Sequence, residues 1–118
     1  MGDVPVAVEV VRGDRVESRH RLSLCVADAQ GRVVQAVGDR TEVWFDGGIR
    51  SGQDVLKAVA LGARGTMIGK SFLYGLGAMG EAGVTLALEI IRKELDVTMA
   101  LCGLQNIKDA SPSILRPA

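Results

Sequence analysis

The sequence predicts an α/β protein, with a short β-hairpin segment at residues 1–40 followed by alternating strands and helices at residues 41–118. Three observations carry this prediction. Apolar residues alternate with period two before residue 38, short β-rich runs end at glycines after residue 41, and apolar residues at helical spacing lie between those runs. We therefore expect two segments of different character that meet at about residues 38–41.

The first segment is rich in alternating valines and leucines. Val6, Val8 and Val10 alternate with smaller or polar residues, as in a half-buried strand. Residues 28–31 (Asp-Ala-Gln-Gly) form a favourable turn sequence. Together with the apolar runs on both sides, this turn predicts a β-hairpin over residues 22–37.

The second segment begins as a βαβ unit. Residues 41–45 and 66–68 are short β-rich runs, and the helix between them has Ser51 as its expected N-cap and Asp54 as its capping-box partner. Gly62 is suited to the end of that helix. A strand, a short helix and a second strand predict two parallel neighbouring strands.

A longer helix is expected at about residues 82–95. Leu86, Ile90 and Ile91 recur at helical spacing and are expected to mark its buried face. Beyond it, Pro112 and Pro117 are expected to end regular structure.

Composition excludes several functional classes. The 14 basic and 14 acidic residues balance, and only 3% of residues are aromatic, which argues against nucleic-acid binding. Cys25 and Cys102 are expected to be buried reduced thiols, and a metal site is not expected with His20 as the single histidine. No run has the length of a membrane span, and the first residues do not resemble a signal peptide, so a cytoplasmic location is expected.

The candidate functional residues follow the two strands of the βαβ unit. Glycines at a strand end let the backbone approach a ligand, and free N–H groups there and at the start of the next helix suit a phosphate. A nearby cation adds charge for the same anion. The residues in these positions are Asp46, Gly47, Gly48, Arg50, Gly69 and Lys70. This arrangement is typical of the phosphate site after strands seven and eight of a TIM barrel. The alternative is that they are ordinary turn glycines beside solvated charges.

Residues 41–117 as a whole resemble the FMN-dependent α-hydroxy acid dehydrogenases, the family of L-lactate dehydrogenases and glycolate oxidases. The resemblance is carried by the runs FDGGIRSGQDVLKA, ALGA, MIGK, GEAGV, IIRKEL and TMALCG. It implies the last βαβα quarter of a TIM (β/α)8 barrel, with FMN as cofactor. Asp46, Gly48 and Arg50 would belong to the first FMN-phosphate loop, and Gly69 and Lys70 to the second.

The resemblance also implies a reaction, the oxidation of L-lactate or a similar 2-hydroxy acid to the 2-oxo acid. In the family, a catalytic histidine and a substrate-binding arginine lie in an HGxR-type motif upstream of the DGGIR strand. This sequence has no such motif, and His20 lies in a charged stretch typical of a solvated surface. We therefore assign no catalytic residue and expect no activity from this chain alone. The family usually has arginine at the position of Lys70, and lysine lacks the bidentate fork.

Residues 4–39 have a different resemblance, to the opening of a bacterial L-asparaginase II. It is carried by Pro5-Val6, the run VESRHR at 16–21 and Gly31-Arg32-Val33. Two alternatives to a flavoenzyme fragment therefore stay open: a non-enzymatic fused or truncated gene product, and an asparaginase-related amidohydrolase fragment.

An incomplete barrel is also expected to self-associate. Two strands of an incomplete barrel leave open sheet edges and an uncovered apolar face, which are typical sites of association. No nucleic-acid partner is expected.

Overall fold

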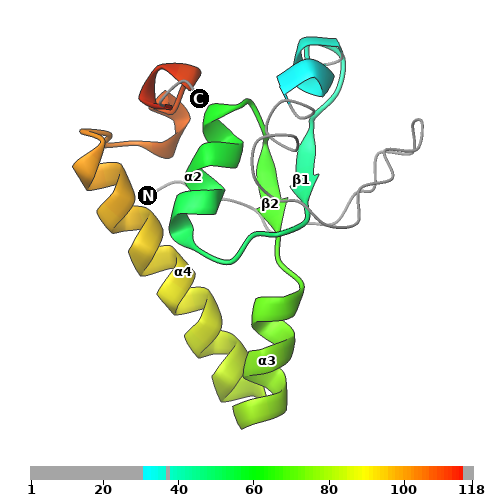
Figure 1. Cartoon of the computed structure of the whole chain (residues 1–118), viewed down its shortest axis with the longest axis vertical. Coiled ribbons are helices and arrows are strands. Elements are labelled where there is room, and N and C mark those ends of the chain that lie inside the picture. Colours follow the sequence, from blue (N-terminus) through cyan, green and yellow to red (C-terminus); the bar gives the residue numbers. More distant parts are fainter. Residues whose placement is uncertain (1–30, 37, 116–118) are drawn as a thin grey trace.

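The computed structural model describes residues 31–36 and 38–115, and its elements alternate between strands and helices before ending in two packed helices (Figure 1). The elements in chain order are β1 (Trp44–Asp46), α2 (Gly52–Ala60), β2 (Gly65–Met67), α3 (Lys70–Met79) and α4 (Glu81–Leu101), followed by 3-10 turns η1 (Ile107–Asp109) and η2 (Pro112–Ile114). The described residues are therefore α/β, as the sequence predicts.

β1 and β2 form a two-stranded parallel sheet. Trp44 pairs with Gly65, Phe45 with Thr66 and Asp46 with Met67. A Cβ at Gly65 would lie 2.4 Å from the Trp44 ring, so glycine is what allows the two strands to approach at this pair. The predicted βαβ unit is confirmed, with β1 later and β2 slightly earlier than the expected ranges.

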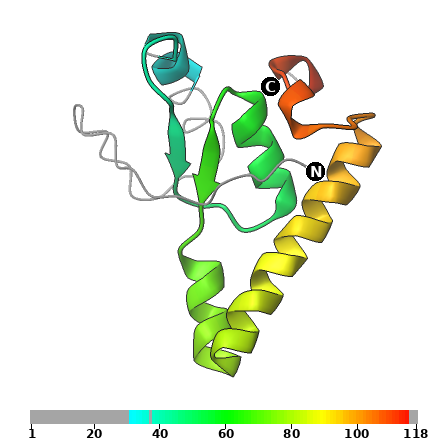
Figure 2. The ribbon, with the colours of Figure 1, turned by 180° about the vertical axis from the view of Figure 1, so that it is seen from behind.

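α2 lies between the two strands and α4, and the two opposite views agree on this arrangement (Figures 1 and 2). Ser51 is its N-cap, and Ser51 and Asp54 form the predicted capping box. Gly62 follows the C-cap and has a φ of +97°, a conformation that favours glycine. Both predicted helix ends are therefore confirmed.

A small apolar core joins the strands, α2 and α4. It is formed by the buried residues Ile49, Val55, Ala58, Ala63 and Ile91, with Phe45, Val59, Ile68 and Leu95 packed around them. Because Ile91 and Leu95 belong to α4, this helix completes the core that the βαβ unit begins.

Glycines bring the helix backbones into direct contact. A Cβ at Gly52 would lie 2.0 Å from the Leu95 nitrogen, so the start of α2 rests on the backbone of α4. α3 and α4 meet in the same way, since a Cβ at Gly83 would lie 1.9 Å from the Gly75 carbonyl oxygen. Figure 2 shows α3 and α4 joined as a helical hairpin beyond the strand ends.

The predicted hairpin over residues 22–37 is wrong in its described part. Residues 31–36 are helical rather than extended. A Cβ at Gly62 would lie 2.6 Å from a Val34 methyl, so this turn of helix packs against the end of α2. Residues 22–30 and Val37, like the strand predicted at Val6 to Val10, lie outside the described residues.

The later helix is longer and less buried than expected. α4 runs from Glu81 to Leu101 instead of residues 82–95, and α3 was not predicted. On the expected buried face, Ile91 is 9% exposed, but Leu86 and Ile90 are 46% and 49% exposed. Within the described residues, that side of α4 is therefore only partly covered.

Candidate functional site

The predicted site residues lie where the two strands end. Asp46 is the last residue of β1 and pairs with Met67, the last residue of β2. Because the strands are parallel, the chain leaves both at the same edge of the sheet, with Gly47 and Gly48 after β1 and Gly69 and Lys70 after β2. The structure therefore brings the two predicted loops to one edge.

The first loop depends on the backbone freedom of two glycines. Gly47 has a φ of +125° and Gly48 a φ of +72°. A Cβ at Gly47 would meet nothing within 4 Å, so its backbone conformation, rather than crowding, requires glycine there. The turn leaves open space beside the end of β1, as a loop that receives a ligand requires.

The start of α2 is closed by the chain's own carboxylates. Asp54 Oδ2 accepts hydrogen bonds from the backbone nitrogens of Arg50 and Ser51, each at 3.1 Å. Glu94 Oε2, from α4, accepts from the Gly52 nitrogen at 3.0 Å, and Ser51 Oγ accepts from the Asp54 nitrogen at 3.3 Å. The prediction of free N–H groups at this helix start is therefore wrong for Arg50, Ser51 and Gly52, whose N–H groups Asp54 and Glu94 accept in place of an external anion.

The start of α3 is open. Gly69 is its N-cap, no side chain caps the helix, and no acidic residue lies in its first turn. A Cβ at Gly69 would meet nothing within 4 Å. The first N–H groups of a helix carry partial positive charge, so this start offers donors and space to an anion at the edge where β2 ends.

Two cations at this edge are uncommitted. Arg50 and Lys70 are exposed, and within residues 31–36 and 38–115 neither side chain makes a hydrogen bond or an ion pair. Arg64 differs, since its Nε lies 3.2 Å from Glu42 Oε1. Arg50 and Lys70 are therefore available to a ligand.

The described residues hold no metal site, since no group of three or more His, Cys, Asp or Glu side chains gathers among them. His20 and Cys25 lie outside the described ranges. Cys102 is a free thiol, but it is exposed rather than buried as expected, because it follows the last turn of α4. None of the helices in the described part of the chain combines the length and apolar character needed to cross a membrane.

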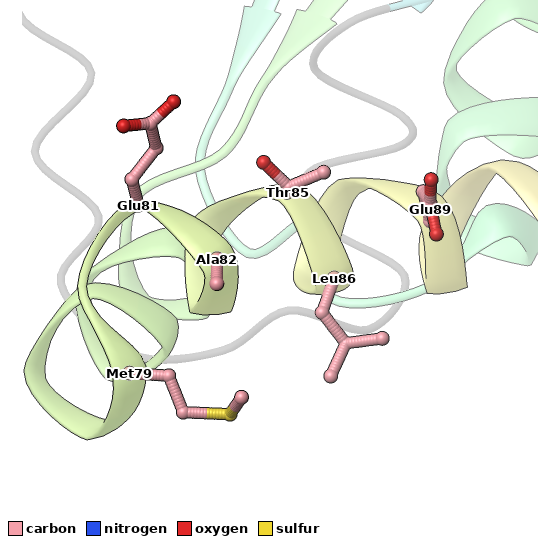
Figure 3. Close-up of a pocket in the computed structure, with 6 residues that line it drawn as sticks. All are labelled: Met79, Glu81, Ala82, Thr85, Leu86 and Glu89. Carbon is pink, nitrogen blue, oxygen red and sulfur yellow. The ribbon is translucent and has the colours of Figure 1, made fainter.

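A surface hollow lies elsewhere, at the junction of α3 and α4 (Figure 3). Its lining comes from the end of α3 and the first turns of α4: Met79, Glu81, Ala82, Thr85, Leu86 and Glu89. None of the predicted site residues lines it. The hollow is therefore separate from the strand-end site, and the two carboxylates in its lining do not suit a phosphate.

Comparison with known proteins agrees with the resemblance of the second segment. L-lactate dehydrogenase from Caulobacter vibrioides is 49% identical over 92 residues, which are 78% of this chain and 24% of that protein. Pre-mycofactocin synthase from Mycobacterium tuberculosis is 52% identical over 81 residues, 69% of this chain and 20% of that protein. The chain thus spans about a quarter of the length of the relatives it matches.

Solved structures agree with the fold. A soluble mutant of membrane-associated (S)-mandelate dehydrogenase from Pseudomonas putida superposes with a TM-score of 0.74 at 36% identity, covering 78% of this chain and 26% of that one. A flavocytochrome b2 mutant with pyruvate bound gives a TM-score of 0.68 at 39% identity, covering 77% and 23%. These neighbours are TIM barrels, and the described residues form a part of that architecture.

The family is shown by a match that covers most of the sequence. The FMN-dependent dehydrogenase family model matches residues 23–117. The predicted resemblance to L-asparaginase II at residues 4–39 is not among these findings and stays a prediction, as does the segment boundary at residue 40. The chain, by the extent of this match, belongs to the FMN-dependent dehydrogenase family.

Proposed function

We propose that this chain holds the phosphate end of FMN at the edge where β1 and β2 end, as the cofactor-binding part of an enzyme that oxidises 2-hydroxy acids. The observation that carries the proposal is the pairing of an open helix start at Gly69 with two uncommitted cations, Arg50 and Lys70. A phosphate needs N–H donors, positive charge and space, and all three occur together here.

Each residue has a distinct task in this proposal. Asp46 ends β1 and fixes where the loop begins, while Gly47 and Gly48 let the backbone turn close to the phosphate. Arg50 supplies a planar cation with several donors. Gly69 leaves the start of α3 open, and Lys70 adds a second charge, without the bidentate geometry of an arginine.

The chemistry divides between the cofactor and the protein. FMN, when bound, accepts the electrons released as a 2-hydroxy acid becomes a 2-oxo acid. The described residues contain no histidine that could take the proton released by the 2-hydroxy acid. We therefore propose that these residues bind and orient FMN, and that oxidation needs groups beyond them.

Flavin titration tests this proposal. FMN and riboflavin differ only in the phosphate, so quenching of flavin fluorescence by the purified chain should saturate with FMN and be much weaker with riboflavin. Replacing either Arg50 or Lys70 by alanine should weaken FMN binding by about tenfold, the size expected for losing a charge-assisted hydrogen bond.

The control for charge is Lys57→Ala, because Lys57 is an exposed cation in the last turn of α2, away from the strand ends. It should bind FMN as the unchanged chain does. Equal binding of FMN and riboflavin would remove the phosphate site from the proposal. If neither flavin binds, a non-enzymatic fused or truncated gene product becomes the better account.

We also propose that the chain self-associates when it is produced alone. The large apolar side chains that are at least 40% exposed lie mainly on α3 and α4: Leu73, Tyr74, Leu76, Met79, Leu86, Leu88, Ile90, Val97 and Leu101. Each strand of the two-stranded sheet also has one edge without a partner strand in the described residues. Such surfaces promote association. Size-exclusion chromatography should show oligomers or loss on the column, whereas a sharp monomer peak would contradict the proposal.

A further inference from the structure

The loop that carries Gly47, Gly48 and Arg50 is tied to the rest of the chain at both ends. At its start, Asp46 is paired with Met67 in the sheet. At its end, three successive backbone nitrogens, those of Arg50, Ser51 and Gly52, donate to carboxylates. Between these points the two glycines have positive φ and no side chain, and Ile49 is buried in the core, so the loop is held by Ile49 and by its two ends.

The third of these hydrogen bonds differs from the other two in its origin. Asp54 lies in the same helix start and moves with it, whereas Glu94 belongs to α4, 42 residues away in the sequence. Among the described residues it is the side-chain hydrogen bond that spans the greatest length of chain. The Glu94 hydrogen bond therefore ties the end of the loop to α4, whereas the Asp54 hydrogen bonds tie it only to the start of α2.

Around this hydrogen bond, the backbones of α2 and α4 are in close contact. Gly52 is buried, and a Cβ placed on it would lie 2.5 Å from the Glu94 carbonyl carbon and 2.0 Å from the Leu95 nitrogen. The α2 start thus rests on the α4 backbone at the residue whose side chain holds its N–H. Together, this contact and the hydrogen bond restrain the position of the backbone between Arg50 and Gly52 relative to α4.

We propose that Glu94 is a positioning residue for the phosphate loop, acting through the Gly52 N–H to hold Arg50 at the edge where α3 begins. The inference rests on the proposed FMN-phosphate site. It assigns to α4, which contributes no residue to that site, the role of fixing one of its two cations.

The test compares three variants in the full chain: Glu94→Ala, Glu94→Gln and the control Glu89→Ala. Alanine removes the acceptor, whereas glutamine keeps a carbonyl oxygen that can accept from Gly52. Glu89 is an exposed glutamate on the same helix, five residues earlier, with no hydrogen bond or ion pair in the described residues. FMN and riboflavin titrations are combined with amide hydrogen exchange of the loop, measured without flavin.

Glu94→Ala should speed exchange of the Gly52 amide by about tenfold and of the Gly47–Arg50 amides by a smaller factor, and should weaken FMN binding by about fivefold. Weak riboflavin binding should not change, since riboflavin lacks the phosphate that the loop receives. Glu94→Gln and Glu89→Ala should stay close to the unchanged chain in both measurements.

Two outcomes would overturn the inference. If Glu94→Ala leaves loop exchange and FMN affinity unchanged, the hydrogen bond does not position the loop. If it weakens FMN and riboflavin by the same factor, Glu94 supports the fold in general. The exchange measurement keeps this test separate from the proposed function, because it reports on the loop even if the unchanged chain binds no flavin.

Discussion

The starts of α2 and α3 face the same sheet edge but are used in opposite ways. At α2, Asp54 and Glu94 accept the N–H groups of Arg50, Ser51 and Gly52. At α3, no side chain caps the helix and Gly69 is bordered by open space. Both starts carry the partial positive charge of a helix N-terminus. At α2 the chain's own carboxylates accept the N–H groups and stabilise the fold, whereas at α3 the N–H donors are left for a ligand.

The closed start of α2 depends most strongly on Gly52, where it contacts the backbone of α4. Gly52→Ala would place a Cβ 2.0 Å from the Leu95 nitrogen, a backbone atom that cannot move without shifting the helix. We expect a loss of about 3 kcal/mol in the free energy of unfolding, at the upper end for overpacking. The midpoint of urea unfolding measures this loss.

Gly77→Ala is the matched control for that change. Gly77 also lies in a helix, α3, but a Cβ there would meet nothing within 4 Å. Alanine should therefore raise stability by roughly 0.5–1 kcal/mol through its better helix propensity. Equal midpoints for the two variants would show that the α2–α4 contact is not tight.

The open start of α3 can be given a carboxylate like the ones at α2. Gly69→Asp would add a carboxylate at the start of α3, where φ is −118° and ψ is −74° and a Cβ would meet nothing within 4 Å. Because this backbone is helical rather than extended, the carboxylate should act mainly through its charge and stabilise the helix by about 0.5 kcal/mol. It should also weaken FMN binding at least about tenfold, because it repels the phosphate.

Gly69→Asn separates the effect of charge from that of size in that variant. Asparagine fills the same space without a charge, so its FMN affinity should fall between those of the unchanged chain and Gly69→Asp. Thermal unfolding and flavin titration measure both effects. FMN binding that survives the aspartate unchanged would show that the α3 start is not the phosphate position.

The sequence predicted the features that depend on neighbouring residues. The strand that stops before the two glycines at 47 and 48, and the capping box of Ser51 and Asp54, are local patterns, and both occur in the structure, with the strand ending one residue later than predicted. α3 was missed because Gly75 and Gly77 have poor helix propensity and because its packing depends on Gly83, in the next helix.

Long-range contacts also account for the errors at the site and in the first segment. Glu94 gave no local signal as the partner of Gly52, since the two are 42 residues apart. The free N–H predicted at Gly52 was wrong for that reason, whereas those of Arg50 and Ser51 are accepted by Asp54, a local partner. Residues 31–36 contain valines typical of a strand, but they are helical and Val34 packs against Gly62, a contact that no local pattern reveals.

The smallest expected effect concerns the chemistry of the second cation. Lys70 is the first residue of α3, where the family usually has arginine, and its ammonium offers a point charge to the phosphate. Lys70→Arg should tighten FMN binding by about threefold, because a guanidinium donates two parallel hydrogen bonds to phosphate oxygens. Riboflavin binding should not change, and Lys57→Arg, at the far end of α2, should leave both affinities unchanged. Tighter binding of both flavins would mean that arginine acts through the fold. Weaker FMN binding would mean that the site accommodates the compact ammonium of lysine better than the larger guanidinium of arginine.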